Sequence, residues 1–383
     1  MKKPEKLTYS EYNEKISQIA TPIGLYLVPT NLAEEREKFL NSETYNPHFT
    51  YRKANKRKNF EILDELSDLQ EITNVDPELS KYFIDVIAAK KQASELLEAI
   101  GDDEKFAKIS KERFGFPSDK LYSRVCKILR GRYGSIEVVN RDTKMKEREL
   151  GFDDIVAIFT KVFSVLGLDD WTIEGSKAIA ASEFRTTAKT KRIMIDPGIE
   201  TNAERIKKTI VHEVMTHAVR SENGYSTGFD TFGKPNLIEY LDAEEGLALY
   251  NEELYGVLRN IDIKRKAAQT YAVYLSETMS FREVFKAMNA VYPKRNAFAT
   301  VLRVKRGMSE TSRPGGYYKD VSYLRGFLKV RKFLKDNEVG YRNLYAGKIG
   351  LDHLYLVEEG ILPKPQIVPS KEAVKSMFKQ VGL

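Results

Sequence analysis

The chain has 383 residues, of which 42% are hydrophobic and 31% are charged, enough apolar material for one large domain or two ordinary ones. No apolar run is long enough to cross a bilayer, and the start, MKKPEKLTYSEYNEK, lacks the apolar stretch of a secretory signal. The single cysteine, Cys126, excludes an intramolecular disulfide framework and a cysteine-rich zinc site. We therefore expect a cytoplasmic protein with no membrane partner.

The net charge of +7 favours acidic partners only weakly. The densest basic stretch is YRKANKRKN, residues 51–59, which has the charge to contact phosphate groups or an acidic polypeptide. Runs of this kind are usually solvated surface, and the stretch contains no recognisable nucleic-acid module. We expect no specific nucleic-acid partner, and a non-catalytic regulator or nucleic-acid binder is the most distant alternative.

Helical spacing dominates the first part of the chain. Apolar residues recur at this spacing over 60–107, where Gly101 is a plausible helix end. Further helices are predicted at DKLYSRVCKILRG (119–131) and GFDDIVAIFTKVFSVLG (151–167).

No repeat and no Gly/Ser linker divides the chain. We divide it into an N-terminal extension (1–22), a mainly helical region packed on the catalytic core (23–135) and a catalytic region (136–383). One continuous domain over 23–383 is the alternative, because nothing in the composition marks a boundary at 135.

A strand pair is predicted in the middle of the chain. KAIAASEF (177–184) and KRIMID (191–196) are short apolar or alternating runs separated by RTTAKTK. Pro197 and Gly198 end the second strand.

A helix is predicted from near Thr201, whose T-x-x-E spacing to Glu204 is a capping-box signal, to near Gly224. After a loop, LIEYLDAEEGLALYNEELYG (237–256) forms the next helix. More helices follow to about residue 336, interrupted by SRPGG, and a Pro-punctuated stretch, LPKPQIVP, precedes a last short helix.

The helix after the strand pair carries VHEVMTH, in which His212 and His217 bracket Glu213. Five steps of an ideal α-helix turn about 140°, which would point the two rings apart. A single π-type turn absorbs one extra residue and realigns them, and such turns are frequent at functional sites. The spacing therefore predicts a wide or distorted helix with both rings on one metal ion. His48 and His353 stand alone and are interpreted as structural.

A catalytic zinc ion needs three protein ligands and an open position, so a third ligand must come from elsewhere. In the following helix, Glu245 lies on the same stripe as apolar residues and faces the interior, where an unpaired carboxylate would be costly. Glu244 or Asp242 remains an alternative ligand. Glu213 would act as the base that activates water beside the zinc ion and passes a proton to the leaving amine.

HEVMTHAVRSENG followed by EEGLALYNEE resembles the microtubule-associated tyrosine carboxypeptidases and their bacterial QEGLA-motif relatives, the flavohaemoglobin expression-modulating proteins. The family combines H-E-x-x-x-H with a later E-G-L-A glutamate as third zinc ligand. The resemblance implies that His212, His217 and Glu245 bind Zn²⁺ and that Glu213 is the catalytic acid and base. LVPTNLAEEREKFL, YNPHFTYR and GGYYKDVSYLRGFLKV are similar to other segments of the family.

Eukaryotic members of the family remove a C-terminal tyrosine or glutamate from acidic protein tails, which implies a protein or peptide C-terminal tail as the substrate here. A carboxypeptidase must bind a terminal carboxylate, which arginine does best. RPGGYYKDVSYLR offers Arg313, Lys319 and Arg325 for this purpose. Tyr323 is a candidate donor to the developing oxyanion. A solvated amphipathic helix after a glycine turn is the alternative interpretation of this stretch.

These observations predict an α+β fold, mostly helical and zincin-like, with a small β-sheet beside the H-E-x-x-x-H helix. The predicted function is that of a zinc-dependent metallocarboxypeptidase that removes Tyr-like or Glu-like C-terminal residues. A zinc endopeptidase or aminopeptidase is the alternative. The strand pair is also a candidate edge for binding an extended peptide.

Overall fold

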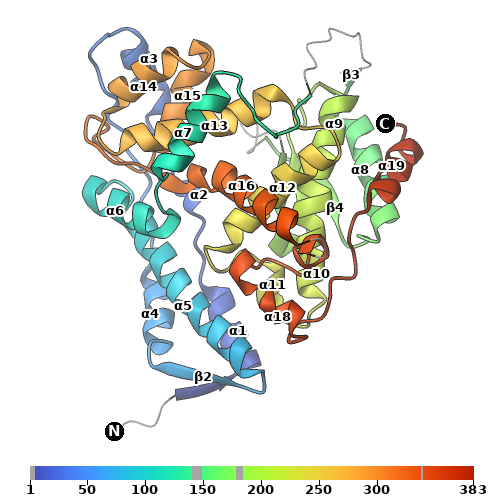
Figure 1. The fold of residues 1–383 in the computed structure, drawn as a ribbon. Helices are drawn as coiled ribbons and strands as arrows, with labels where there is room; N and C mark the ends of the chain where they lie inside the picture. Colours follow the sequence, from blue (N-terminus) through green and yellow to red (C-terminus); the bar gives the residue numbers. More distant parts are fainter. Residues whose placement is uncertain (1–4, 140–148, 178–183, 338–339) are drawn as a thin grey trace. The chain divides into compact units, whose positions relative to one another are not determined.

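The computed structural model of the protein describes residues 5–139, 149–177, 184–337 and 340–383 (Figure 1). Helices predominate and the strands are short, so the fold is α+β, as the sequence predicts. The chain forms two compact units, Met1–Gly134 with Ile261–Arg325 and Ser135–Asn260 with Gly326–Leu383. Among the described residues, no helix is both long and apolar enough to span a membrane.

The first unit is mainly helical, with one two-stranded parallel sheet of β1 and β2. Its described elements are β1 (Glu5–Thr8), α1 (Tyr9–Gln18), α2 (Ile23–Tyr26), α3 (Leu32–Leu40), α4 (Arg57–Glu65), β2 (Leu69–Thr73), α5 (Pro77–Glu98), α6 (Asp103–Phe114), α7 (Asp119–Leu129), most of α13 (Asn260–Ser276), α14 (Phe281–Asn289), α15 (Lys294–Lys305), η4 (Tyr318–Asp320) and the first residues of α16 (Val321–Asp336).

Local signals explain several of these helices. Asp76 caps the backbone N–H of Glu78 at the start of α5, and Pro77 occupies the first turn, where its missing N–H costs nothing. Gly101 follows the end of this helix with a φ of 92°, which confirms the predicted stop. The helical pattern over 60–107 is not continuous, however, because β2 interrupts it and pairs with β1.

The second unit contains the remaining part of α16 together with β3 (Glu149–Leu150), α8 (Phe152–Leu166), β4 (Thr172–Gly175), β5 (Phe184–Thr187), η2 (Ala188–Thr190), β6 (Arg192–Ile195), β7 (Thr201–Asn202), α9 (Ala203–Thr209), the π-helix η3 (Ile210–Ala218), α10 (Val219–Tyr225), α11 (Asp230–Gly233), α12 (Tyr240–Leu254), α17 (Gly340–Asn343), η5 (Leu351–His353), α18 (Tyr355–Glu358) and α19 (Lys371–Gln380).

The central strand of the three-stranded sheet is β6, which pairs in parallel with β4 and antiparallel with β5. The sequence correctly places β6, but the connection predicted over 185–191 is wrong in its first residues, which belong to β5 (Phe184–Thr187). Residues 178–183 lie outside the described part of the chain, and β5 occupies residues expected to form the connection. Phe184, Thr186 and Thr187 favour extended backbone, and the turn falls later, where Lys191 adopts a φ of 48°.

Three consecutive segments, α9, η3 and α10, form one unbroken helical stretch from Ala203 to Tyr225. The cap is Asn202, whose side chain accepts from the backbone N–H of Arg205, rather than the predicted Thr201. The predicted stop at Gly224 is one residue short of the end. Gly224 is instead needed for space, because a Cβ there would clash with the backbone carbonyl of Phe232.

Close packing fixes the position of α12, the helix that lies opposite η3. α12 runs along η3 and is also in close contact with α16. A Cβ on Gly326 would clash with the carbonyl of Asp242, and a Cβ on Gly246 would clash with the backbone of Gly326. The two glycines let the helix backbones approach, so α12 is held in one position and presents one face to η3.

Candidate metal centre

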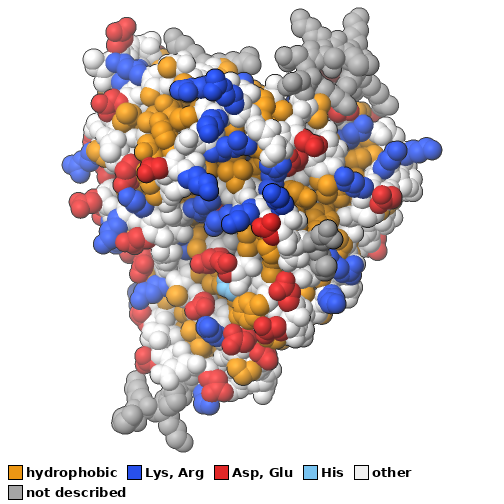
Figure 2. All heavy atoms as spheres, in the orientation of Figure 1, with side chains coloured by type: hydrophobic (Ala, Val, Ile, Leu, Met, Phe, Trp, Pro, Cys, Tyr) orange, Lys and Arg blue, Asp and Glu red, His pale blue; other side chains and the backbone are white. Residues whose placement is uncertain are grey.

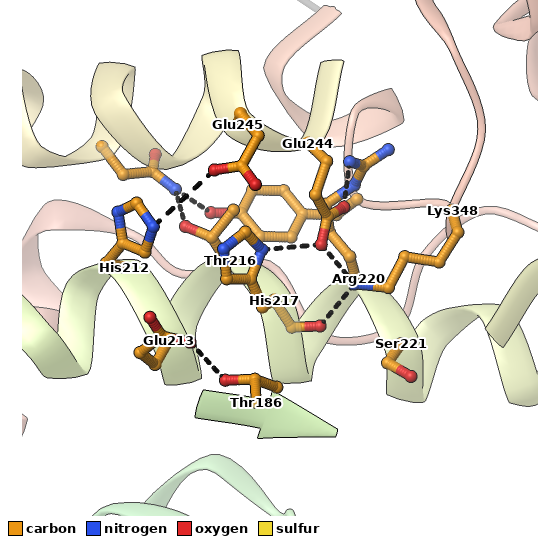
Figure 3. Close-up of polar contacts among 12 residues, drawn as sticks. Thr186, His212, Glu213, Thr216, His217, Arg220, Ser221, Glu244, Glu245 and Lys348 are labelled. Carbon is orange, nitrogen blue, oxygen red and sulfur yellow. Dashed lines mark hydrogen bonds and ion pairs between the residues drawn. The ribbon is translucent and has the colours of Figure 1, made fainter. Parts of the chain in front are cut away.

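The helix that carries the two histidines is locally wide, as the five-residue spacing predicts. The segment from Ile210 to Ala218 is a π-helix. The ring centroids of His212 and His217 lie 4.9 Å apart, with the ring planes at 85° (Figure 3). The prediction of a distorted helix is thereby confirmed, and both rings lie on the face towards α12.

The third member of the cluster is Glu245 on α12. Its carboxylate Oε2 lies 3.9 Å from Nε2 of His212. One ligand atom from each of His212, His217 and Glu245 lies within 4.8 Å of the others. The three side chains are 17%, 13% and 13% exposed in that order, so the cluster is largely buried but accessible.

The two alternative acids have other partners. The carboxylate of Asp242 accepts a hydrogen bond of 2.7 Å from Lys329. Glu244 points to the other side of His217, where its Oε1 lies 2.7 Å from Nδ1. Of the three acids that the sequence offers, only Glu245 joins the candidate ligand cluster among the described residues.

Each histidine is oriented by a carboxylate that the sequence analysis did not assign to this role. Nδ1 of His212 lies 2.8 Å from Oε1 of Glu252, and Nδ1 of His217 is held by Glu244. With Nδ1 donating to a carboxylate, Nε2 of each ring carries the free lone pair. Glu252 lies two helical turns after Glu245, so helical periodicity would have identified it as a second inward carboxylate.

Glu244 belongs to a buried charge network. Arg220 Nη1 and Lys348 Nζ both donate to its carboxylate, and Lys348 also donates to the carbonyl of His217 at 2.9 Å (Figure 3). Burial alone would favour the neutral acid, but the charges of Lys348 and Arg220 hold the pKa of Glu244 well below its ordinary value. The network therefore keeps a negative charge against the ring of His217.

Glu213 lies beside the two rings and is held from the sheet side. The hydroxyl of Thr186, on the edge strand β5, donates to its carboxylate (Figure 3). Burial favours the neutral acid, but the neighbouring histidines and this hydrogen bond together hold the pKa of Glu213 below its ordinary value. The side chain is thus an ionised carboxylate beside the two rings, and its role as catalytic base stays a prediction.

The three candidate substrate-binding residues, Arg313, Lys319 and Arg325, and the candidate oxyanion donor Tyr323 lie in the first unit. The ammonium of Lys266 lies 3.4 Å from the ring centroid of Tyr323, and Arg325 donates to the carbonyl of Phe114 at 2.7 Å. Arg313 is exposed and Lys319 is half-buried. Their roles in substrate binding stay predictions.

Most of the basic side chains in the run at 51–59 are exposed, namely Arg52, Lys53, Arg57 and Lys58. Arg57 pairs with Glu61 at 2.7 Å, the ammonium of Lys56 lies 5.5 Å from the ring centroid of Tyr26, and Asn59 is buried. The other two histidines lie outside the cluster: His48 is exposed and pairs with Glu310, and His353 is on η5.

Fold and site together define an α+β protein with a candidate metal centre of the H-E-x-x-x-H type, completed by a glutamate from the following helix. A family model described as "Microtubule-associated tyrosine carboxypeptidase" matches residues 37–381. The chain belongs to this family, as its sequence motifs suggest.

The individual relatives share only modest sequence identity with this chain. Over 163 residues the chain is 29% identical to the mouse protein named "Putative tyrosine carboxypeptidase MATCAP2", covering 41% of this chain and 31% of the relative. Over 311 residues it is 24% identical to mouse "Microtubule-associated tyrosine carboxypeptidase 1", covering 79% and 55%. The matches thus span about a third to a half of these relatives.

The match to a solved structure is weaker than these sequence matches. A solved chain described as the "putative lipoprotein from Colwellia psychrerythraea" has a TM-score of 0.41 and 11% sequence identity, with 98% of this chain and 75% of that chain covered. A likeness at this level carries no argument about function.

Proposed function

We propose that the protein is a zinc-dependent metallocarboxypeptidase of a zincin-like type that acts on the C-terminal tails of proteins or peptides. The observation that carries the proposal is the convergence of His212, His217 and Glu245 across a π-helix, with Glu213 beside them. Membership of the tyrosine carboxypeptidase family supports the choice of a carboxypeptidase over other peptidases.

The donor set fits zinc. Two imidazoles and one carboxylate are the ligand types of catalytic zinc sites, which use three protein ligands and leave a fourth position open. Glu252 and Glu244 engage the Nδ1 atoms, so both Nε2 atoms are free to bind a metal ion. With the rings 4.9 Å apart and the carboxylate of Glu245 3.9 Å from His212, the three side chains are close enough to bind a single ion.

Zinc, when bound, lowers the pKa of water to about 7 and polarises a carbonyl group. Glu213 then takes the proton of the attacking water and transfers it to the leaving amine. An ionised carboxylate is needed for the first step, which agrees with the lowered pKa of Glu213. The hydroxyl of Thr186 fixes the orientation of the carboxylate towards the ligand cluster.

The substrate assignment rests on the family. The relatives are named as tyrosine carboxypeptidases, so a tail ending in tyrosine is the first substrate to test. Arg313, Lys319 and Arg325 are proposed to bind the terminal carboxylate, and Tyr323 to stabilise the oxyanion. An endopeptidase or aminopeptidase with the same zinc site is the alternative.

Two measurements test the proposal. Metal analysis of the purified protein should give about one zinc ion per chain, as expected for three protein ligands, and the double variant His212→Ala/His217→Ala should lose it. Mass spectrometry of peptides should show loss of the last residue only when the C-terminus is free. Absence of zinc in fresh protein would refute the metal site, and cleavage of amidated peptides would favour the alternative peptidases.

A further inference from the structure

The π-helix is closed on its inner side by a threonine hydroxyl. Thr216 Oγ1 donates to the carbonyl of Val211 at 3.0 Å, across the same five-residue step that separates His212 from His217. The side chain is fully buried. This hydrogen bond therefore spans the turn whose width brings the two rings onto one face.

A second buried side chain fixes the direction of that hydroxyl. Asn251 on α12 donates through Nδ2 to Thr216 Oγ1 at 2.8 Å and to the hydroxyl of Tyr345 at 2.9 Å. Its Oδ1 accepts from the hydroxyl of Tyr341 at 3.0 Å. Since Thr216 accepts from Asn251, its own proton is left to point at Val211.

We propose that Thr216, Asn251 and Tyr345 are positioning residues that hold the π-turn and thereby set the affinity of the candidate metal centre. The inference rests on the proposed zinc site. The three residues are neither candidate metal ligands nor the carboxylates of Glu244 and Glu252 that orient the two rings. α12 thus contacts η3 in two ways. The carboxylates of Glu252 and Glu244 contact the histidine rings, and the uncharged side chain of Asn251 binds the hydroxyl of Thr216.

The physical reason is a competition between two local helix geometries, the regular α-helical turn and the wider π-type turn. In a regular α-helix the five-residue step would separate the rings by about 140°, and only the wider turn gives a three-ligand site. Apparent affinity falls in proportion to the fraction of molecules in the competent state. Removal of the hydroxyl frees the carbonyl of Val211 from its side-chain donor and leaves one N–H of Asn251 without a partner.

The experiment measures zinc affinity by chelator competition on the full chain, together with the visible spectrum of the cobalt-substituted protein. Thr216→Val should weaken zinc binding by about 10- to 100-fold, the range seen when groups supporting metal ligands are removed. It should also change the cobalt spectrum. Thr216→Ser keeps the hydroxyl and should bind within about threefold of the wild type.

Ser221→Ala is the matched control. Ser221 is also fully buried, lies on α10 just beyond the π-helix and donates to the carbonyl of Gly233 at 2.6 Å (Figure 3). Loss of the Ser221 hydroxyl should lower the thermal unfolding midpoint without changing zinc affinity or the cobalt spectrum. Tyr345→Phe, which removes only the far end of the link, should weaken zinc binding less than Thr216→Val and serves if that variant does not fold.

The outcomes separate the inference from the proposed function. If the wild type binds no zinc, both fail together. If the wild type binds zinc, and folded Thr216→Val or Tyr345→Phe binds it equally well with the same cobalt spectrum, the inference alone is overturned. Equal weakening by Ser221→Ala would also overturn it, because general destabilisation would then explain the loss.

Discussion

At the scale of single residues, the proposed chemistry depends on Glu213, an acid that is kept ionised although it is buried. We expect Glu213→Gln to reduce kcat by about 10²- to 10⁴-fold, because proton transfer is lost while the ligand set is intact. The zinc content should stay at the wild-type level. A variant that loses metal and activity together would show that Glu213 supports the ligands instead of acting as the base.

The orienting carboxylates allow a second test at this scale. Glu252→Gln replaces the carboxylate at Nδ1 of His212 by a neutral amide and should weaken zinc binding by about tenfold or more. Glu239→Gln, at an exposed position just before the same helix, is the control and should bind zinc as the wild type does. Titration against a chelator checks both, and equal affinities would remove Glu252 from the site.

Lys305 permits a pH prediction for the first unit. It is fully buried and donates to the carbonyls of Met279 and Arg313, both at 2.7 Å. Burial lowers the pKa of Lys305 to about 7. Between that value and the ordinary lysine pKa, the unfolded chain binds one more proton, so this group raises the free energy of unfolding as the pH increases.

Lys305→Met removes this contribution. From pH 7 to pH 9 the unfolding free energy of the wild type should rise relative to that of the variant by up to about 1.4 kcal/mol per pH unit. Denaturant unfolding at several pH values measures the difference. A difference that does not change with pH would mean that Lys305 keeps its proton in the folded protein.

At the scale of elements, spacing alone predicts the unusual helix. The position of His217 five residues after His212 is a local signal, and a π-turn is the local answer to it. The stripe on α12 likewise places Glu245 inward. What the sequence does not reveal is the partner of each acid. Glu244 and Glu245 are adjacent, and only the packing of α12 on η3 decides which one faces the cluster and which one faces Arg220 and Lys348.

The error in the connection predicted before β6 has a similar origin. The threonines before η2 have the polar composition of a connection, but their β-branched side chains pair well against β6. Thr186 is therefore a strand residue, and its hydroxyl donates to the carboxylate of Glu213. No periodicity in a four-residue strand signals this, because the contact is made by residues far apart in the sequence.

The close approach of α12 and α16 gives a prediction for elements. Gly326→Ala would place a Cβ against the carbonyl of Asp242, so the helices must move apart, at a cost of about 1–3 kcal/mol. Zinc affinity should fall as well, since α12 carries Glu245. Gly198→Ala, in an exposed turn where a Cβ meets only ordinary contacts, is the control. Thermal unfolding and zinc titration of both variants test this, and unchanged affinity in Gly326→Ala would show that the site tolerates movement of α12.

At the scale of the whole molecule, charge is unevenly divided. Lysine and arginine outnumber aspartate and glutamate in the first unit, and the acids slightly outnumber the bases in the second. Figure 2 shows basic side chains gathered over part of the visible face. The candidate metal centre is therefore in the unit without the basic excess, and the residues proposed to bind the substrate carboxylate are in the unit that has it.

The basic excess predicts a specific salt dependence. For a peptide with acidic residues before its C-terminal tyrosine, KM should rise several-fold as the ionic strength is raised from about 0.05 M to 0.5 M, because attraction by the net positive charge of the protein is screened. The value of kcat should change little, since the reacting groups are largely buried. A peptide of equal length with neutral residues before the tyrosine should show a flat KM. Equal salt dependence for the two peptides would mean that the basic excess has no part in substrate binding and that recognition is confined to the terminal residue.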